Sequence, residues 1–387
     1  MDLEEKDEHR LVRETVRRLA DEVIAPRASE LDRTGEYPAE AMAQLAELGL
    51  MGIPFPEEYG GSGMDSQAYA IAIEEVARGC GSTALTLSAH TSLGTNPIFI
   101  AGTEEQKRRF VPPLASGKVL GAFGLTEPTA GSDAGATRTV ARRDGGNYVL
   151  NGKKVYMTNA GHAGTAIITA RTSDEPGTHG ITAFIVETAT PGFRLGTREN
   201  KLGLRASDTW EVLLEDCRVP VENRLGGEGE GFKVFMKTLD GGRIGIGALA
   251  LGLARAAHER ALHYARERKT FGKPIAEHQA IAFKLADMAV RIQTSRHLIY
   301  HAAALKDAGK PFGKEAAMAK LHASEAAVQV CYDAIQVLGG YGYLHEYEVE
   351  RLYRDAKLCE IGEGTSEIQR MVISRAILRE AEARDPG

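Results

Sequence analysis

The chain has 387 residues, of which 43% are hydrophobic and 26% are charged, and its formal net charge is −6. One ordinary domain holds roughly 100–200 residues, so two or three domains are expected. The composition is typical of a globular protein, and no run approaches the roughly 20 apolar residues of a membrane span. The negative charge argues against a broad nucleic-acid-binding surface, because such binding depends on neutralising phosphates.

The cysteines and the N-terminus bear on the cellular compartment. The four cysteines lie far apart and lack metal-binding spacing: Cys80, Cys217, Cys331 and Cys359. Neither a zinc site nor a disulfide framework is indicated, which favours reduced thiols. Residues 1–10 are rich in acidic side chains, unlike a secretory or transit peptide. We therefore expect a cytoplasmic, bacterial protein without a metal site.

The first 120 residues predict an α-helical domain. Val12, Val16 and Leu19 recur at helical spacing, and Pro26 is expected to end this first helix. Further helical or buried apolar segments are expected at 38–48, 66–77 and 82–100. Thr103 and Gln106 form a capping-box pattern for a short helix that ends near Pro112 and Pro113.

Residues 121–230 predict a small β domain of the sandwich or barrel type. Glycine and aspartate separate short β-branched runs, such as 165–172 and 181–188. The Asn151-Gly152 pair predicts a β-hairpin between the runs 148–150 and 155–157.

Residues 231–387 predict a C-terminal helical bundle. Ile281, Leu285 and Met288 recur at steps of three and four residues, and similar patterns fill 244–268, 313–338 and 365–380. Four such helices favour a four-helix bundle.

Glu363 stands between two glycines, where a loop enters the last helix. Thr365 or Ser366 is expected to cap that helix. Flanking glycines permit unusual backbone angles and close approach of a ligand. A carboxylate facing an apolar cleft has a raised pKa, which suits a general base near neutral pH. The alternative is an ordinary acidic residue that the helix dipole favours.

Five segments carry a family resemblance. They are 123–133 (FGLTEPTAGSD), 156–159 (YMTN), 268–272 (RKTFG), 336–342 (QVLGGYG) and 360–370 (EIGEGTSEIQR). In this order along the whole chain, they resemble the acyl-CoA dehydrogenase family. The resemblance implies a mainly α fold with a central β domain, divided into an N-terminal helical domain (1–120), a middle β domain (121–230) and a C-terminal four-helix bundle (231–387).

The resemblance also implies FAD, held where the β domain meets the bundle. The implied contacts on the same subunit are Phe123, Leu125, Thr126, Gly131, Ser132, Tyr156, Met157, Thr158, Thr365 and Glu367. Read by themselves, the glycines and hydroxyls of 123–132 offer N–H and O–H donors to diphosphate oxygens, although an ordinary turn-rich loop has the same composition. Tyr156 replaces the tryptophan of many relatives and preserves a flat apolar wall.

A second set of residues matches positions that reach the FAD of a neighbouring subunit in the family. These are Arg268, Thr270, Phe271, Gln279, Gln336, Val337, Gly339 and Gly340. Because arginine presents paired donors in one plane, Arg268 suits a diphosphate. Gly339 and Gly340 are equally typical of a helix C-terminus. A shared cofactor site implies a homotetramer, built as a dimer of dimers.

The resemblance implies that Glu363 takes the α proton of an acyl-CoA while a β hydride passes to the flavin. A trans-2-enoyl-CoA results, and the electrons pass to an electron-transfer flavoprotein. Some relatives carry the base at the position of Gly242, which cannot serve here. Implied substrate contacts are Ser132, Asp240, Arg243 and Gly364, although Arg243 could equally be a surface ion-pair residue.

The substrate stays open at this point. Leu85 and Ala89 match the usual end of the acyl pocket, and both are apolar, which favours an unsubstituted or branched aliphatic tail. Alternatives of the same fold are an acyl-CoA oxidase or flavin monooxygenase that reacts with O₂. A DNA-binding branch of the family carries an added basic C-terminal region, whereas this chain ends with Glu380, Glu382 and Asp385.

Overall fold

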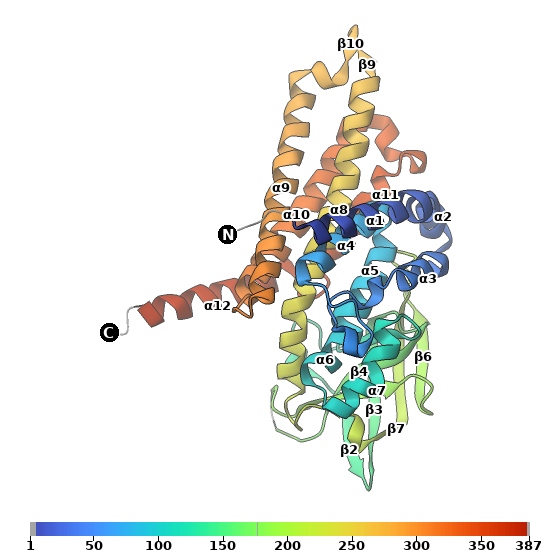
Figure 1. Cartoon of the computed structure of the whole chain (residues 1–387), viewed down its shortest axis with the longest axis vertical. Coiled ribbons are helices and arrows are strands. Elements are labelled where there is room, and N and C mark those ends of the chain that lie inside the picture. Colours follow the sequence, from blue (N-terminus) through green and yellow to red (C-terminus); the bar gives the residue numbers. More distant parts are fainter. Residues whose placement is uncertain (1–4, 176, 385–387) are drawn as a thin grey trace.

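The computed structural model describes residues 5–175 and 177–384, so residues 1–4 of the acidic N-terminus and Asp385 lie outside the described residues. Helices come first along the chain, then a β-sheet, then long helices (Figure 1). The elements of the first part are α1 (Asp7–Leu19), a π-helical turn (Ala20–Ile24), α2 (Ala25–Thr34), α3 (Ala39–Glu47), α4 (Ser66–Gly79), α5 (Gly81–Ser88), a second π-helical segment (Ala89–Thr95), α6 (Asn96–Ala101) and α7 (Glu104–Ala115).

Proline does not end the first helix where the sequence suggested. The first helical path continues through Pro26 to Thr34, because a π-helical turn intervenes and Pro26 falls in the first turn of α2. In the first turn, a missing N–H costs no intrahelical bond. The end predicted at Pro26 was therefore wrong, whereas α7 includes Pro112 and Pro113 and ends at Ala115, close to its predicted end. The capping box of Thr103 and Gln106 is confirmed.

The middle part is one eight-stranded sheet in the order β6-β7-β3-β2-β4-β5-β8, with β1 paired to β4. The strands are β1 (Leu120–Gly124), β2 (Val140–Asp144), β3 (Asn147–Thr158), β4 (Ala163–Arg171), β5 (Ile181–Glu187), β6 (Phe193–Arg198), β7 (Thr209–Pro220) and β8 (Arg224–Leu225). Most neighbouring strands are antiparallel, but β1 and β4 run parallel. The predicted β domain is therefore confirmed.

The predicted hairpin at Asn151-Gly152 was wrong. Both residues lie inside β3, where the register with β7 shifts between Leu150 and Gly152. The Asn151 side chain binds Asp216 of β7 through two hydrogen bonds of 2.9 and 3.0 Å, which holds this irregularity in place. The actual hairpin turn is Gly145-Gly146, between β2 and β3.

The last part consists of α8 (Gly231–Glu267), a small hairpin of β9 (Lys269–Thr270) and β10 (Lys273–Pro274), α9 (Gln279–Asp307), α10 (Gly313–Leu338), α11 (Val349–Cys359) and α12 (Ser366–Arg384). The bounds predicted for α10 are confirmed, whereas α8 begins earlier than predicted and α11 was not foreseen. Helix α12 extends away from the rest of the chain (Figure 1).

One hydrophobic core joins the N-terminal helices to the bundle, with Ile71 of α4, Leu249 of α8 and Val330 of α10 among its members. Buried ion pairs strengthen this junction, since Glu74 of α4 accepts hydrogen bonds from Arg255 of α8 and Arg296 of α9 at 2.8 and 2.7 Å. The long helix α8 is thus held firmly on both sides, and it carries Asp240, Gly242 and Arg243. Among the described residues, no helix has the length and apolar character required to cross a membrane.

Candidate active site

Glu363 lies in the short loop between α11 and α12 and has a left-handed backbone conformation, with φ at 53°. Gly364 follows with φ at 90°. A positive φ is costly for a residue with a side chain and persists only where the surroundings enforce it. Thr365 then caps α12, because its Oγ1 accepts a hydrogen bond from the Ile368 N–H at 3.3 Å. Of the two expected caps, Thr365 is the one observed.

The Glu363 carboxylate points into the protein against α8. Its Oε2 is buried and has no hydrogen-bond partner among the described residues. A Cβ placed on Gly242 would overlap that oxygen and would lie 3.0 Å from Cδ. Burial raises the pKa of Glu363 to about 7, against the opposing positive charges of Lys320 and Arg243. The carboxylate is therefore poised to exchange a proton near neutral pH, unlike an exposed acid at a helix start.

The backbone around Glu363 leaves a free donor beside the free acceptor. Within the described chain, the Glu363 N–H donates no hydrogen bond. The carbonyl oxygens face the other way, because Gln369 Nε2 donates to the oxygens of Glu363 and Gly364 at 3.2 and 2.9 Å. Unpaired backbone donors are rare in folded proteins. Together with Oε2, this N–H is suited to a polar ligand.

Asp240 and Arg243 flank the carboxylate from α8. Arg243 is only 1% exposed and donates from Nη1 to Asp240 Oδ1 at 2.6 Å, so the surface ion pair considered as an alternative was wrong. Arg243 Nε is also buried, and no described residue binds it. Glu363, Arg243 and Asp240, all predicted from the sequence, thus lie together with Gly242 on one side of the site.

A second polar group lies one helical turn further along α8. A Cβ on Gly245 would lie 2.6 Å from Ser88 Oγ and 2.7 Å from the Tyr69 hydroxyl, and those two oxygens are 3.2 Å apart. Both side chains are buried, as are Leu85 and Ala89 on the neighbouring helical path. Three residues of an α-helix span about 4.5 Å, so this closely packed wall stands about one turn from Gly242.

A separate cavity of about 520 Å³ opens at the far end of the bundle. Of the residues predicted to reach a neighbour's cofactor, those that line it are Arg268, Thr270, Val337, Gly339 and Gly340. No atom lies within 4 Å of a Cβ placed on Gly339 or Gly340, so the backbone is open to a ligand. The volume is typical of a ligand site.

Three predicted residues do not line that cavity. Gln279 and Gln336 are exposed, and the Phe271 side chain is 97% exposed with a backbone φ of 51°. Conversely, sequence reasoning missed Tyr264, Tyr341 and His278, which do line it. Arg268 lies over the Tyr341 ring at 5.9 Å, and Tyr341 stood within the 336–342 motif, which was the available signal.

Residues 123–132, the predicted flavin segment, are held in place by a buried ion pair. Lys154 of β3 donates to Glu127 Oε1 at 2.7 Å and to the Leu125 carbonyl at 3.1 Å. Glu127 also accepts the N–H groups of Arg138 and Thr139 at 2.7 and 3.0 Å. These contacts fix both ends of the loop that holds Thr126, Gly131 and Ser132.

The flavin segment leaves suitable surfaces open for a cofactor. Gly131 and Ser132 are exposed, and a Cβ on Gly131 would meet nothing within 4 Å. Tyr156 is 66% exposed with φ at 56°, whereas Met157 is buried beneath it. An exposed aromatic ring beside an open glycine loop fits a large planar group with a polar tail, as FAD requires.

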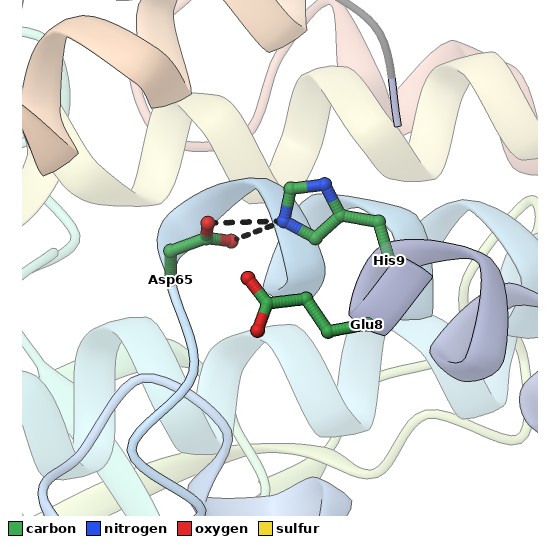
Figure 2. Close-up of side chains that lie close together, drawn as sticks. All are labelled: Glu8, His9 and Asp65. Atoms are coloured by element: carbon green, nitrogen blue, oxygen red, sulfur yellow. Dashed lines mark hydrogen bonds and ion pairs between the residues drawn. The ribbon is translucent and has the colours of Figure 1, made fainter. Parts of the chain in front are cut away.

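A third cluster has the composition of a cation site, but its contacts indicate a structural role. His9 Nε2 lies 2.9 and 3.0 Å from the two carboxylate oxygens of Asp65, with Glu8 beside them (Figure 2). Asp65 also caps α4 through the Ala68 N–H at 2.8 Å, and Lys6 Nζ lies 3.2 Å from it. Because these donors already satisfy the carboxylate, the cluster joins α1 to α4.

Family models match three successive stretches of the chain. Residues 6–118 match "Acyl-CoA dehydrogenase, N-terminal domain", residues 122–217 match "Acyl-CoA dehydrogenase, middle domain" and residues 229–378 match "Acyl-CoA dehydrogenase, C-terminal domain".

Individual proteins match over nearly the whole chain. A probable acyl-CoA dehydrogenase of Bacillus subtilis (strain 168) is 56% identical over 98% of this chain and 100% of its own. The structure of butyryl-CoA dehydrogenase from Megasphaera elsdenii superposes with a TM-score of 0.96 at 47% identity, over 98% and 100% of the two chains. A chain in a structure of the electron transferring flavoprotein of Acidaminococcus fermentans superposes with a TM-score of 0.97 at 47% identity, again over 98% and 100% of the two chains.

Proposed function

Because the chain belongs to the acyl-CoA dehydrogenase family, we propose that it desaturates a short-chain acyl-CoA thioester to the trans-2-enoyl-CoA, with Glu363 as the base. Enzymes of this family are FAD-dependent oxidoreductases, and FAD is the cofactor of this chain. The observation that carries the proposal is the pair formed by Glu363 Oε2 and the Glu363 N–H, neither of which has a hydrogen-bond partner among the described residues.

The two free groups match the two needs of the reaction. The α C–H of a thioester is weakly acidic, so a base must stand at the α carbon while a donor meets the charge that develops on the thioester oxygen. Glu363 Oε2 is the proposed base and receives the α proton. Its own N–H is the proposed donor to the oxygen. Bound FAD supplies the acceptor for the hydride that leaves the β carbon.

Other residues hold the cofactor and the CoA portion. The flavin segment with Tyr156, Met157 and Thr158, together with Thr365 and Glu367, is the proposed cradle for FAD. Ser132, Asp240, Arg243 and Gly364 are the proposed contacts of the thioester arm. Arg243 is suited to this role, because no described residue binds its buried Nε. These assignments stay predictions.

The preference for a short acyl chain is supported by the close packing of Tyr69 and Ser88 against Gly245, one helical turn beyond Gly242. If the acyl chain runs along α8 from Gly242, it meets the Tyr69–Ser88 pair after about one helical turn. That pair leaves no room even for a Cβ on Gly245, so little length remains for the tail. Identity of 47% with a butyryl-CoA dehydrogenase supports the same conclusion.

Partners and location follow from the same relatives. We propose an electron-transfer flavoprotein as the electron acceptor, supported by the matching chain in such a structure. A homotetramer is proposed because the 520 Å³ cavity opens at the surface, where a second subunit could complete it. Location in the cytoplasm of a bacterium stays a prediction, and the four buried free thiols are consistent with it.

The test is anaerobic mixing of the FAD-loaded enzyme with acyl-CoAs of increasing chain length, with flavin absorbance as the readout. We expect butyryl-CoA to bleach the flavin fastest and long-chain substrates to bleach it slowly or not at all. Reoxidation by O₂ in the product complex is expected to be slow. Failure of every acyl-CoA to bleach the flavin, or rapid reoxidation by O₂, would contradict the dehydrogenase proposal.

A further inference from the structure

Lys320 of α10 is a buried lysine that the proposed chemistry leaves without a role. Its side chain is 0% exposed, and its single hydrogen bond among the described residues runs from Nζ to the Gly364 carbonyl at 2.8 Å. Lys154, which is equally buried, has the Glu127 carboxylate at 2.7 Å. Burying an ammonium without a directly bound acid is costly, so a specific reason for Lys320 is expected.

Lys320 acts on the strained part of the catalytic loop. The Gly364 carbonyl accepts from Lys320 and also from Gln369, whose side chain reaches the Glu363 carbonyl as well. Glu363 and Gly364 are the two successive residues with positive φ in this loop. Donors from α10 and α12 therefore hold the two carbonyls on one side, which turns the Glu363 N–H and carboxylate toward α8.

Glu363 is one of the groups on which the charge of Lys320 acts. Three ionisable groups face the Glu363 carboxylate from different helices: Lys320 of α10, Arg243 of α8 and Tyr69 of α4. Arg243 is already paired with Asp240 at 2.6 Å. Among the described residues, Lys320 Nζ binds the Gly364 carbonyl and forms no salt bridge, so its charge acts on Glu363 through space and no closer carboxylate competes for it.

Two further ionisable groups near Lys320, Glu360 and Cys359, are not its ionic partners. Glu360, at the end of α11, is paired with Lys357. Burial raises the pKa of the Cys359 thiol to about 12, so it is neutral at physiological pH. Burial lowers the pKa of Lys320 to about 8, which leaves the ammonium protonated at neutral pH.

We propose that Lys320 is a positioning residue for the base: it holds the Gly364 carbonyl, and with it the left-handed Glu363 backbone, and supplies positive charge that favours the ionised form of the Glu363 carboxylate. This inference rests on the proposed role of Glu363 as the base. The two parts of the role are separable, because a neutral donor can hold the carbonyl without supplying the charge.

The test compares Lys320→Gln, which keeps a donor but removes the charge, with Lys320→Met, which removes both. The readout is the pH profile of anaerobic flavin reduction by butyryl-CoA between pH 6 and 9. Loss of a nearby positive charge raises the pKa of a carboxylate. In both variants, the pH at which the rate falls on the acidic side of the profile (the acid limb) is therefore expected to rise by about one unit. Lys320→Met is also expected to lower the plateau rate by about tenfold, because the loop loses its anchor.

Two comparisons complete the design. Lys314→Met removes a partly exposed lysine from the same helix, paired with Glu380 at 2.6 Å, and is expected to leave the profile unchanged. FAD content and melting temperature verify that each variant folds. An acid limb at the wild-type pH in both Lys320 variants, or an equal loss of rate at every pH, would overturn the proposal while Glu363→Gln stays inactive. An active Glu363→Gln variant would instead remove the base assignment on which the proposal rests.

Discussion

At the residue scale, the Glu363 carboxylate fills the space that a side chain at position 242 would need. Oε2 lies where the Gly242 Cβ would be, so a side chain there and Glu363 in its observed position exclude each other. The proposed base is therefore Glu363, from the loop before α12, and not a side chain at position 242. Glycine at 242 is required by this close approach, whereas its neighbour Gly241 has space around it.

Gly242→Ala is expected to displace the carboxylate and to lower the rate of flavin reduction on the order of 100-fold, since a shift of about 1 Å at a reacting group has this effect. FAD content should stay normal. The matched control is Gly241→Ala, whose Cβ would have its nearest neighbour at 3.7 Å and whose rate should stay within about twofold of wild type. Equal rates in the two variants would show that the carboxylate does not work from this position.

Glu363 could be predicted from the sequence, but its supporting residues could not. Two flanking glycines and a capping threonine are local signals, and the five motifs supplied the rest. Lys320 and Gln369 reach the loop from α10 and α12, and Lys320 is 43 positions away from Glu363. A single lysine within an apolar helical pattern gives no indication of the carbonyl that it binds. Only the packing of α10 against the loop shows this.

At the scale of elements, local turn chemistry was predictive where no tertiary contact opposed it. The capping box of α7 and the bounds of α10 follow from nearby residues and were confirmed. Asn151-Gly152 failed, because pairing of β3 with both β2 and β7 places it inside a continuous strand. Gly145-Gly146, which forms the actual hairpin, carried an equally good turn signal. Pro26 failed because a π-helical turn lets the helical path continue through it.

At the scale of the whole molecule, two features of the described residues suit contact with another chain. The cavity that contains Arg268 and Gly339 opens at the surface, and α12 projects from the body with exposed apolar side chains: Met371, Ile377 and Leu378. Apolar side chains on a projecting helix indicate a surface that another chain covers. These features support the proposed homotetramer. The sequence showed the residues, but not that they would be left uncovered.

If the proposed tetramer forms, Leu378→Glu is expected to shift it to smaller species in sedimentation velocity, because burial of an unpaired charge in an interface is unfavourable. FAD retention should fall in parallel, since the proposed cofactor site is completed by a neighbouring subunit. The control is Leu48→Glu, which changes an exposed leucine at the end of α3 and should leave the assembly intact. A tetrameric Leu378→Glu variant would place the interface elsewhere.

The most direct test of Glu363 as the base is the rate of anaerobic flavin bleaching by butyryl-CoA in wild type and in Glu363→Gln. The glutamine retains the size of the side chain but cannot accept the α proton. We expect the variant to bind FAD and acyl-CoA normally and to bleach on the order of 1000-fold more slowly, the scale of a lost general base. Bleaching of Glu363→Gln at the wild-type rate would contradict the assignment of Glu363 as the base.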